Sequence, residues 1–354
     1  MKLRAFVGRH RLPVMIIGGA VVICVGAITS FLLLSQPGET APPAPVAPAV
    51  VKKPPVVYYS PLNGVKVADQ AATTKPVTAI MIENGPNARP QSGIKQAEVV
   101  YEAIAEAGIT RFLALYQQNK PALIGPVRSL RMYYIDWLAP YQPSVAHVGG
   151  SLAAVNEIRN GNYRDIDQFF NSASYWRATD RRAPHNVYTN FEKLDALNAS
   201  KQYTSSTFTS FTRADGATSN PPTARVISLN FSNAALYNTR YEYDTNSNTY
   251  KRFVGGQPST DREQGQVTPS VVVALSMETA IVKEDGLRLA MTTIGSGKAT
   301  IFQNGTVIEG TWRKSSRAAS LELLDASGKP IALARGQTWI AAIPTKGGAI
   351  SWQQ

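Results

Sequence analysis

The chain has 354 residues, a formal net charge of +12 and a pI near 9.7, and 44% of its residues are hydrophobic. This length is enough for about two domains with hydrophobic cores. The positive charge favours polyanionic partners, namely nucleic acid, anionic lipid or an acidic cell-wall polymer. The single cysteine, Cys24, excludes a disulfide within one chain, so the core alone must stabilise the fold.

The N-terminus indicates the compartment. Residues 1–12 form a basic tail, and residues 13–34 form an uncharged apolar run. A membrane-spanning helix needs about 20 such residues, and basic residues stay on the cytoplasmic side. We therefore predict a single-pass anchor in the cell membrane, with the N-terminus in the cytoplasm and the following domains outside.

A cleaved signal peptide is the alternative, although its apolar region has only about 7–15 residues. A lipid anchor on Cys24 is disfavoured, because the preceding residues 21–23 (VVI) are not small.

Residues 35–57 are rich in proline and alanine and are predicted to be a linker. In polyproline II conformation, at about 3.1 Å per residue, such a linker reaches about 60 Å. Apolar runs then predict strands at 77–82, 99–104, 109–116 and 144–148, and helices are expected at 133–138, 151–159 and 190–197. The alternation of strands and helices predicts an α+β or α/β domain with a mixed sheet over residues 58–200.

A polar segment, residues 201–222, is predicted to link this domain to a second one at 223–350. Nine strands are expected there, at 225–231, 237–243, 249–254, 270–275, 287–293, 299–302, 306–312, 320–324 and 338–343. Hairpin turns are expected at Asn304-Gly305 and Ser327-Gly328. The second domain is therefore predicted to be mostly β, as a small barrel or sandwich.

Four segments of the first half resemble the YerB-like family of bacterial envelope proteins: residues 81–116, 124–137, 146–151 (AHVGGS) and 182–188 (RAPHNVY). Residues 295–312 and 336–344 extend the resemblance, which covers about 58–344. The domain that defines this family has no known function, and members of the family are often lipoproteins. The resemblance implies a place in the cell envelope and carries over no catalytic residue.

Arginine is concentrated in these segments, and its planar guanidinium matches carboxylate or phosphate groups in a two-pronged geometry. Arg128 and Arg131 follow Gly125-Pro126 and are expected to point the same way from a first helical turn. The candidate ligand-binding arginines are Arg89, Arg111, Arg128, Arg131 and Arg182. The alternative is ion pairing with the nearby acids Glu83, Glu98, Glu102, Glu106 and Asp136.

The AHVGGS segment is predicted to run from a strand end through a glycine turn into a helix. Backbone N–H groups of Gly149, Gly150 and Ser151 at such a helix start attract anions, and His147 at the strand end would face the same crevice. These four residues are predicted to form half of an anion site. Ser151 is interpreted as a helix cap rather than a nucleophile, since the G-x-S-x-G pattern is missing.

Catalysis on a glycan would need a carboxylic acid that donates a proton. The candidate catalytic residues are Glu102, Glu106 and His147, and His185, in a loop with two arginines, is a further candidate ligand-binding residue. No metal site is expected, because only His147 and His185 follow the predicted anchor and no cysteine does. No cofactor is expected either.

The favoured function is binding of a cell-wall glycan or anionic wall polymer, as an accessory to wall assembly or remodelling. The membrane, through the N-terminal helix, and an envelope protein are the other expected partners. A glycan-cleaving enzyme that uses Glu102 or Glu106 as its acid is the first alternative. Nucleic-acid binding outside the membrane is the second and is disfavoured, because no basic run is interleaved with aromatic residues.

Overall fold

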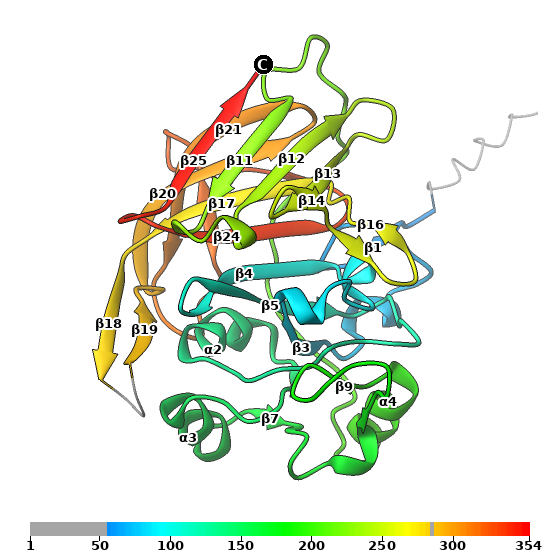
Figure 1. Cartoon of the computed structure of the whole chain (residues 1–354). Coiled ribbons are helices and arrows are strands. Elements are labelled where there is room, and N and C mark those ends of the chain that lie inside the picture. The colour runs from blue at the N-terminus through cyan, green and yellow to red at the C-terminus, as the bar shows by residue number, and fades with distance from the viewer. Residues whose placement is uncertain (1–54, 284–286) are drawn as a thin grey trace, which may run out of the picture. The chain divides into compact units, whose positions relative to one another are not determined.

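The structure is a computed structural model that describes residues 55–283 and 287–354. It contains three α-helices in these ranges, α2 (Met132–Leu138), α3 (Leu152–Asn160) and α4 (Phe191–Ser200). Most other elements are strands, and a mixed sheet dominates (Figure 1). The predicted fold class is confirmed: helices accompany the sheet in the first half, and the second half is mainly strands.

The principal sheet has ten strands. Their order across the sheet is β22 (Glu322–Leu324), β21 (Thr306–Lys314), β20 (Gly295–Gln303), β17 (Val271–Met277), β24 (Thr338–Pro344), β4 (Val99–Glu106), β5 (Ile109–Tyr116), β3 (Thr78–Glu83), β6 (Ser144–Ala146) and β7 (Arg164–Asp165).

The two halves of the sequence share this sheet. Strand β24 pairs in parallel with β4, from Thr338 opposite Val99 to Ala341 opposite Glu102. In chain order β4 is the second strand of this sheet and β24 is the last, and the two lie side by side (Figure 1). Residues 56–354 form one compact unit. That 58–200 and 223–350 behave as separate domains stays a prediction, and so does the linker between them.

A second sheet of five strands gives the second half its sandwich form. Its order is β14 (Gln257–Pro258), β13 (Thr249–Val254), β12 (Thr239–Asp244), β11 (Val226–Asn230) and β25 (Ala349–Gln353). Five strand pairs form small ribbons: β1 (Tyr58–Tyr59) with β2 (Lys66–Val67), β8 (Trp176–Arg177) with β9 (Val187–Tyr188), β10 (Arg213–Ala214) with β23 (Leu333–Ala334), β15 (Thr260–Asp261) with β16 (Gly265–Gln266), and β18 (Thr279–Lys283) with β19 (Leu287–Met291).

Successive side chains of a strand point to opposite faces of the sheet. Because both faces of the principal sheet are covered by other elements, both carry apolar side chains. One face, with Met81 and Leu113, packs against α2 and α3. The other face, with Phe112 and Trp339, packs against α4 and the five-stranded sheet. The polar segment 201–222 is also attached, because β10 pairs with β23 and Phe208 packs on the first core.

The basic tail 1–12, the predicted anchor 13–34 and most of the linker 35–57 lie outside the described residues. Within 55–283 and 287–354, none of the helices has the length and apolar character that crossing a membrane requires.

Candidate functional site

The sequence-predicted residues belong to several separate clusters. Arg128 and Arg131 are not on a helical turn as expected, because Arg131 has extended backbone (φ −130°, ψ 157°) and is the residue before α2. Arg128 faces Glu83, with 3.2 Å between Nε and Oε2, whereas Arg131 donates to Glu106 at 2.5 Å. The two arginines therefore bind different carboxylates and do not form one fork.

Glu102 is fully buried between the two sheets. Both of its oxygens contact Arg252 of β13, at 3.1 and 2.8 Å, and Thr110 Oγ1 and Trp339 Nε1 also donate to it. No substrate reaches a carboxylate that is enclosed in this way, which argues against the expected role of Glu102 as an acid for a glycan.

Glu106 is half-buried and holds two buried arginines. Arg111 donates to Oε1 at 3.1 Å, and Arg131 donates to Oε2. Burial favours the protonated form, but Arg111 and Arg131 outweigh it and lower the pKa of this carboxyl. Glu106 is therefore ionised at neutral pH, which argues against the expected role as a proton donor.

The predicted anion site around AHVGGS contains the protein's own aspartates. Gly149 N donates to Asp167 Oδ1 at 3.1 Å, and Ser151 N donates to Leu130 O. His147 is fully buried, with Nε2 3.0 Å from Asp165 and Nδ1 2.8 Å from Gly149 O. These contacts close the predicted site to an external anion.

Gly150 packs so closely on Leu130 that an added Cβ would lie 2.9 Å from the Leu130 carbonyl oxygen. This glycine therefore allows close backbone packing. Ser151 is the residue before α3, as expected, but its side chain makes no capping hydrogen bond.

The remaining predicted residues lie near the carboxyl end of β3. Arg89 donates to Asn84 Oδ1 and to Leu236 O. His185 Nδ1 lies 2.8 Å from Glu83 Oε1, and Arg182 is exposed in the same loop. The structure thus brings His185 and Arg128 together on one carboxylate, that of Glu83. The sequence predicted Glu83 only as a possible ion-pair partner of an arginine.

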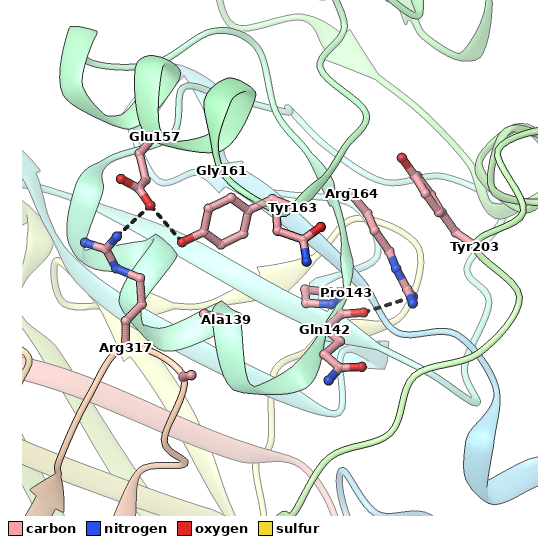
Figure 2. A pocket seen from close by; sticks show the side chains of 11 residues that line it. Ala139, Gln142, Pro143, Glu157, Gly161, Tyr163, Arg164, Tyr203 and Arg317 are labelled. Carbon is pink, nitrogen blue, oxygen red and sulfur yellow. Dashed lines mark hydrogen bonds and ion pairs between the residues drawn. The ribbon is translucent and has the colours of Figure 1, made fainter.

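A cavity of about 680 Å³ lies elsewhere, where the end of α3 meets the loop after β21 (Figure 2). Its walls come from four separate stretches of the chain, 139–143, 157–164, 203 and 317–318. They are formed by Ala139, Gln142, Pro143, Glu157, Gly161, Asn162, Tyr163, Arg164, Tyr203, Arg317 and Ala318. This volume falls in the range of sites that hold drug-sized ligands, about 300–1,000 Å³.

Arg317 joins the two halves of the chain at this cavity. Its Nη1 donates to Glu157 Oε1 at 2.6 Å, and its Nε donates to Asp136 Oδ1 at 2.7 Å. Tyr163 OH also donates to Glu157, at 2.9 Å, and points toward it in Figure 2. Burial and then this hydrogen bond raise the pKa of Tyr163, so its phenol stays protonated at neutral pH.

Local backbone geometry places these side chains. Gly161 ends α3, and a Cβ there would lie 2.4 Å from a ring carbon of Tyr163. Gln142 adopts a left-handed backbone (φ 48°), and its carbonyl accepts from Arg164 Nη1 at 3.1 Å. The Arg164 guanidinium lies 5.5 Å from the ring centre of Tyr203, an arrangement that cation–π attraction stabilises.

The cavity therefore combines two guanidinium groups, two phenols, the Glu157 carboxylate and the side-chain amides of Gln142 and Asn162. These groups can donate and accept hydrogen bonds in several directions. Such a lining suits a hydroxyl-rich or anionic ligand better than an apolar one. No motif in the sequence marks any of the lining residues, and only the Asn160-Gly161-Asn162 turn hints at the end of α3.

No group of His, Cys, Asp and Glu that could hold a metal ion occurs within residues 55–283 and 287–354.

Comparisons with known proteins match both halves of the chain. Residues 62–205 match the family described as "Protein of unknown function (DUF3048) N-terminal domain", and residues 227–340 match the corresponding C-terminal domain. The chain is 30% identical to the Bacillus subtilis (strain 168) protein named "Putative lipoprotein YerB", over 91% of this chain and 94% of that protein. It also resembles a crystal structure of the YerB protein from Bacillus subtilis, with TM-score 0.74 and 28% identity over 83% of this chain and 99% of the other.

Proposed function

This chain belongs to the YerB-like (DUF3048) family, and from this premise we propose that it is a membrane-anchored extracytoplasmic envelope protein that binds a cell-wall glycan in the cavity of Figure 2. The name of the Bacillus relative, a lipoprotein, supports attachment to a membrane from outside the cytoplasm. In this chain the apolar run at 13–34 would supply the anchor. The linker would carry the folded part about 60 Å away, toward the wall.

The observation that carries the proposal is the polar lining of the large cavity. Arg164 donates from Nη1 to Gln142 O and Ser205 O, which leaves Nε and Nη2 without a hydrogen-bond partner among the described residues, and the Tyr203 ring beside it offers a flat surface. Planar guanidinium and aromatic groups present both hydrogen bonds and an apolar face. A sugar ring has the complementary combination of hydroxyl groups and C–H surface, and a carboxylate on the sugar would pair with Arg164.

The two acids expected for the glycan-cleaving alternative are poorly suited to donate a proton to a substrate. Glu102 is enclosed, and Glu106 is ionised against two arginines. Glu157 does line the cavity, but its Oε1 already accepts hydrogen bonds from both Arg317 and Tyr163, so this oxygen is engaged within the protein. We therefore propose binding rather than cleavage, as an accessory to wall assembly or remodelling.

Titration of the full-length protein, in detergent, with purified soluble peptidoglycan fragments tests this proposal. We expect Arg164→Ala to weaken binding about tenfold or more, because a hydrogen bond from a charged group contributes about 1.5–3 kcal/mol. Tyr203→Ala removes the flat surface beside Arg164 and should weaken binding as well. Arg313→Ala removes an equal charge at an exposed site away from the cavity and should leave affinity unchanged.

Melting curves of all variants show whether a loss of affinity reflects unfolding. The proposal fails if the wild type shows no saturable binding, or if Arg164→Ala binds as well as Arg313→Ala. Shortened fragments recovered after incubation would instead support the enzymatic alternative.

A further inference from the structure

A second cluster lies outside the cavity, where β3 ends. Glu83 is 5% exposed, and each of its oxygens has a different partner: Oε1 lies 2.8 Å from His185 Nδ1, and Oε2 lies 3.2 Å from Arg128 Nε. The three residues come from distant parts of the chain, and the side chains of His185 and Arg128 remain 25% and 21% exposed. A buried carboxylate thus orients two side chains that both reach solvent.

The contact with Glu83 fixes the tautomer of His185. A carboxylate only accepts hydrogen bonds, so the proton of the neutral ring is on Nδ1. The other nitrogen, Nε2, then carries a lone pair and accepts from a hydroxyl group or water. Arg128 approaches Glu83 through Nε, and neither Nη group has a hydrogen-bond partner among the described residues, so the planar fork that binds oxyanions is left unused.

A purely structural role for His185 is the competing explanation, and the loop does not require it. Arg181 already attaches this loop to Asn87 O at 3.1 Å and to Pro90 O at 2.5 Å. Asn186 makes further bonds within the loop, to Ala178 O and Arg181 O. The Glu83–His185 contact adds an oriented, solvent-accessible imidazole to a segment that is anchored without it.

We propose that Arg128 and His185, both held by Glu83, form a second ligand site for a small polyol that carries an oxyanion, either phosphate or carboxylate. The Arg128 guanidinium binds the oxyanion, and His185 Nε2 accepts a hydrogen bond from a neighbouring hydroxyl. Glu83 acts as a positioning residue. This site is independent of the cavity and does not rest on the proposed glycan binding there.

Nuclear magnetic resonance of the full-length chain with ¹⁵N-labelled histidine tests the proposal, because the protein has three histidines. Glycerol phosphate is the probe. We expect the ring signals of His185 to shift saturably, while those of His147, whose two ring nitrogens are bound to Gly149 O and Asp165, stay in place. The signal of His185 is identified by its loss in His185→Gln. No saturable shift of His185, or an equal shift of His147, overturns the proposal.

Separate titrations distinguish the chemical sources. Inorganic phosphate and glycerol alone should each bind several-fold more weakly than glycerol phosphate, because each engages only one of the two groups. Glycerate replaces phosphate by carboxylate and shows which oxyanion is preferred. Equal affinity for inorganic phosphate and glycerol phosphate in the wild type would overturn the role of His185.

Variants complete the test. Arg128→Ala should weaken glycerol phosphate binding, followed by the His185 signals, about ten- to a hundredfold, whereas Arg313→Ala on the surface should not change it. If Arg128→Ala fails to fold because Glu83 loses its partner, Arg128→Lys keeps the charge but not the fork, and it should still weaken binding. Unchanged affinity in the folded Arg128 variant overturns the proposal.

Discussion

Two arginines connect the first half of the chain to the second, and their surroundings differ. Arg252 is fully buried, and its nitrogens contact Glu102, Ser259 and Tyr241. Arg317 also pairs with carboxylates, but its side chain is 37% exposed and lines the large cavity. The chemical groups are alike, so solvent access and unused donors, rather than residue type, distinguish the proposed binding site from the enclosed ion pair.

The largest effect is expected at the enclosed pair. Glu102→Ala leaves the Arg252 guanidinium buried without its carboxylate, and breaking a buried ion pair in this way costs about 3–5 kcal/mol. Urea unfolding should show this loss in the free energy of unfolding, while the molecules that remain folded should bind wall fragments like the wild type. A loss below about 1 kcal/mol, or a selective loss of binding, would break the comparison.

A buried carboxylate without an arginine sharpens the comparison. Glu98 is fully buried and accepts from the backbone N–H groups of Gln117, Gln118 and Asn119. Burial raises its pKa from 4.5 to about 7. Between pH 4.5 and about 7 the folded state binds more protons than the unfolded state. The stability that protonated Glu98 contributes is therefore fully present below about pH 4.5 and is lost as the pH rises through about 7.

The change in unfolding free energy from Glu98 is on the order of 3 kcal/mol across this window. Glu98→Gln cannot titrate, so its stability should depend less steeply on pH between about 4.5 and 7. Parallel urea unfolding curves of wild type and variant check this. An identical pH dependence in both would show that the backbone donors keep Glu98 ionised throughout.

The local elements could be predicted from the sequence, but their partners could not. Apolar runs such as 109–116 became strands, and the segments after Arg131 and Ser151 became α2 and α3. Pairing between β24 and β4 joins residues more than 200 positions apart, and no local pattern encodes it. For this reason the sequence pattern predicts a mixed sheet in 58–200 and a barrel or sandwich in 223–350, but not that strands of both segments share one ten-stranded sheet.

The candidate sites show the same limit. The sequence offers Glu102 either as a candidate acid or as an ion-pair partner of an arginine, and nothing near it in the chain indicates that this partner is Arg252, 150 positions later. The cavity could not be predicted from the sequence, because Arg317 and Glu157 are 160 positions apart and come into contact only in the folded chain. By contrast, Arg128 and His185 were both predicted as ligand-binding residues, and the fold places them on one carboxylate.

The smallest effect is expected at an exposed pair on the principal sheet. Arg313 of β21 contacts Glu322 of β22 at 2.7 Å, directly across the strands, and both side chains are about half exposed. Water and salt screen such pairs, and ordering two long side chains offsets the attraction. Arg313→Ala should therefore leave the melting temperature unchanged within error.

This variant also tests the argument drawn from the two arginines. It lowers the net charge by the same amount as Arg164→Ala, but it touches neither the cavity nor the Glu83 cluster. If geometry governs binding, titration with wall fragments at low and at physiological salt should give wild-type affinity for Arg313→Ala in both conditions. Equal losses in Arg313→Ala and Arg164→Ala, present only at low salt, would instead show that a diffuse positive field attracts the ligand, and the cavity would then have no special part in binding.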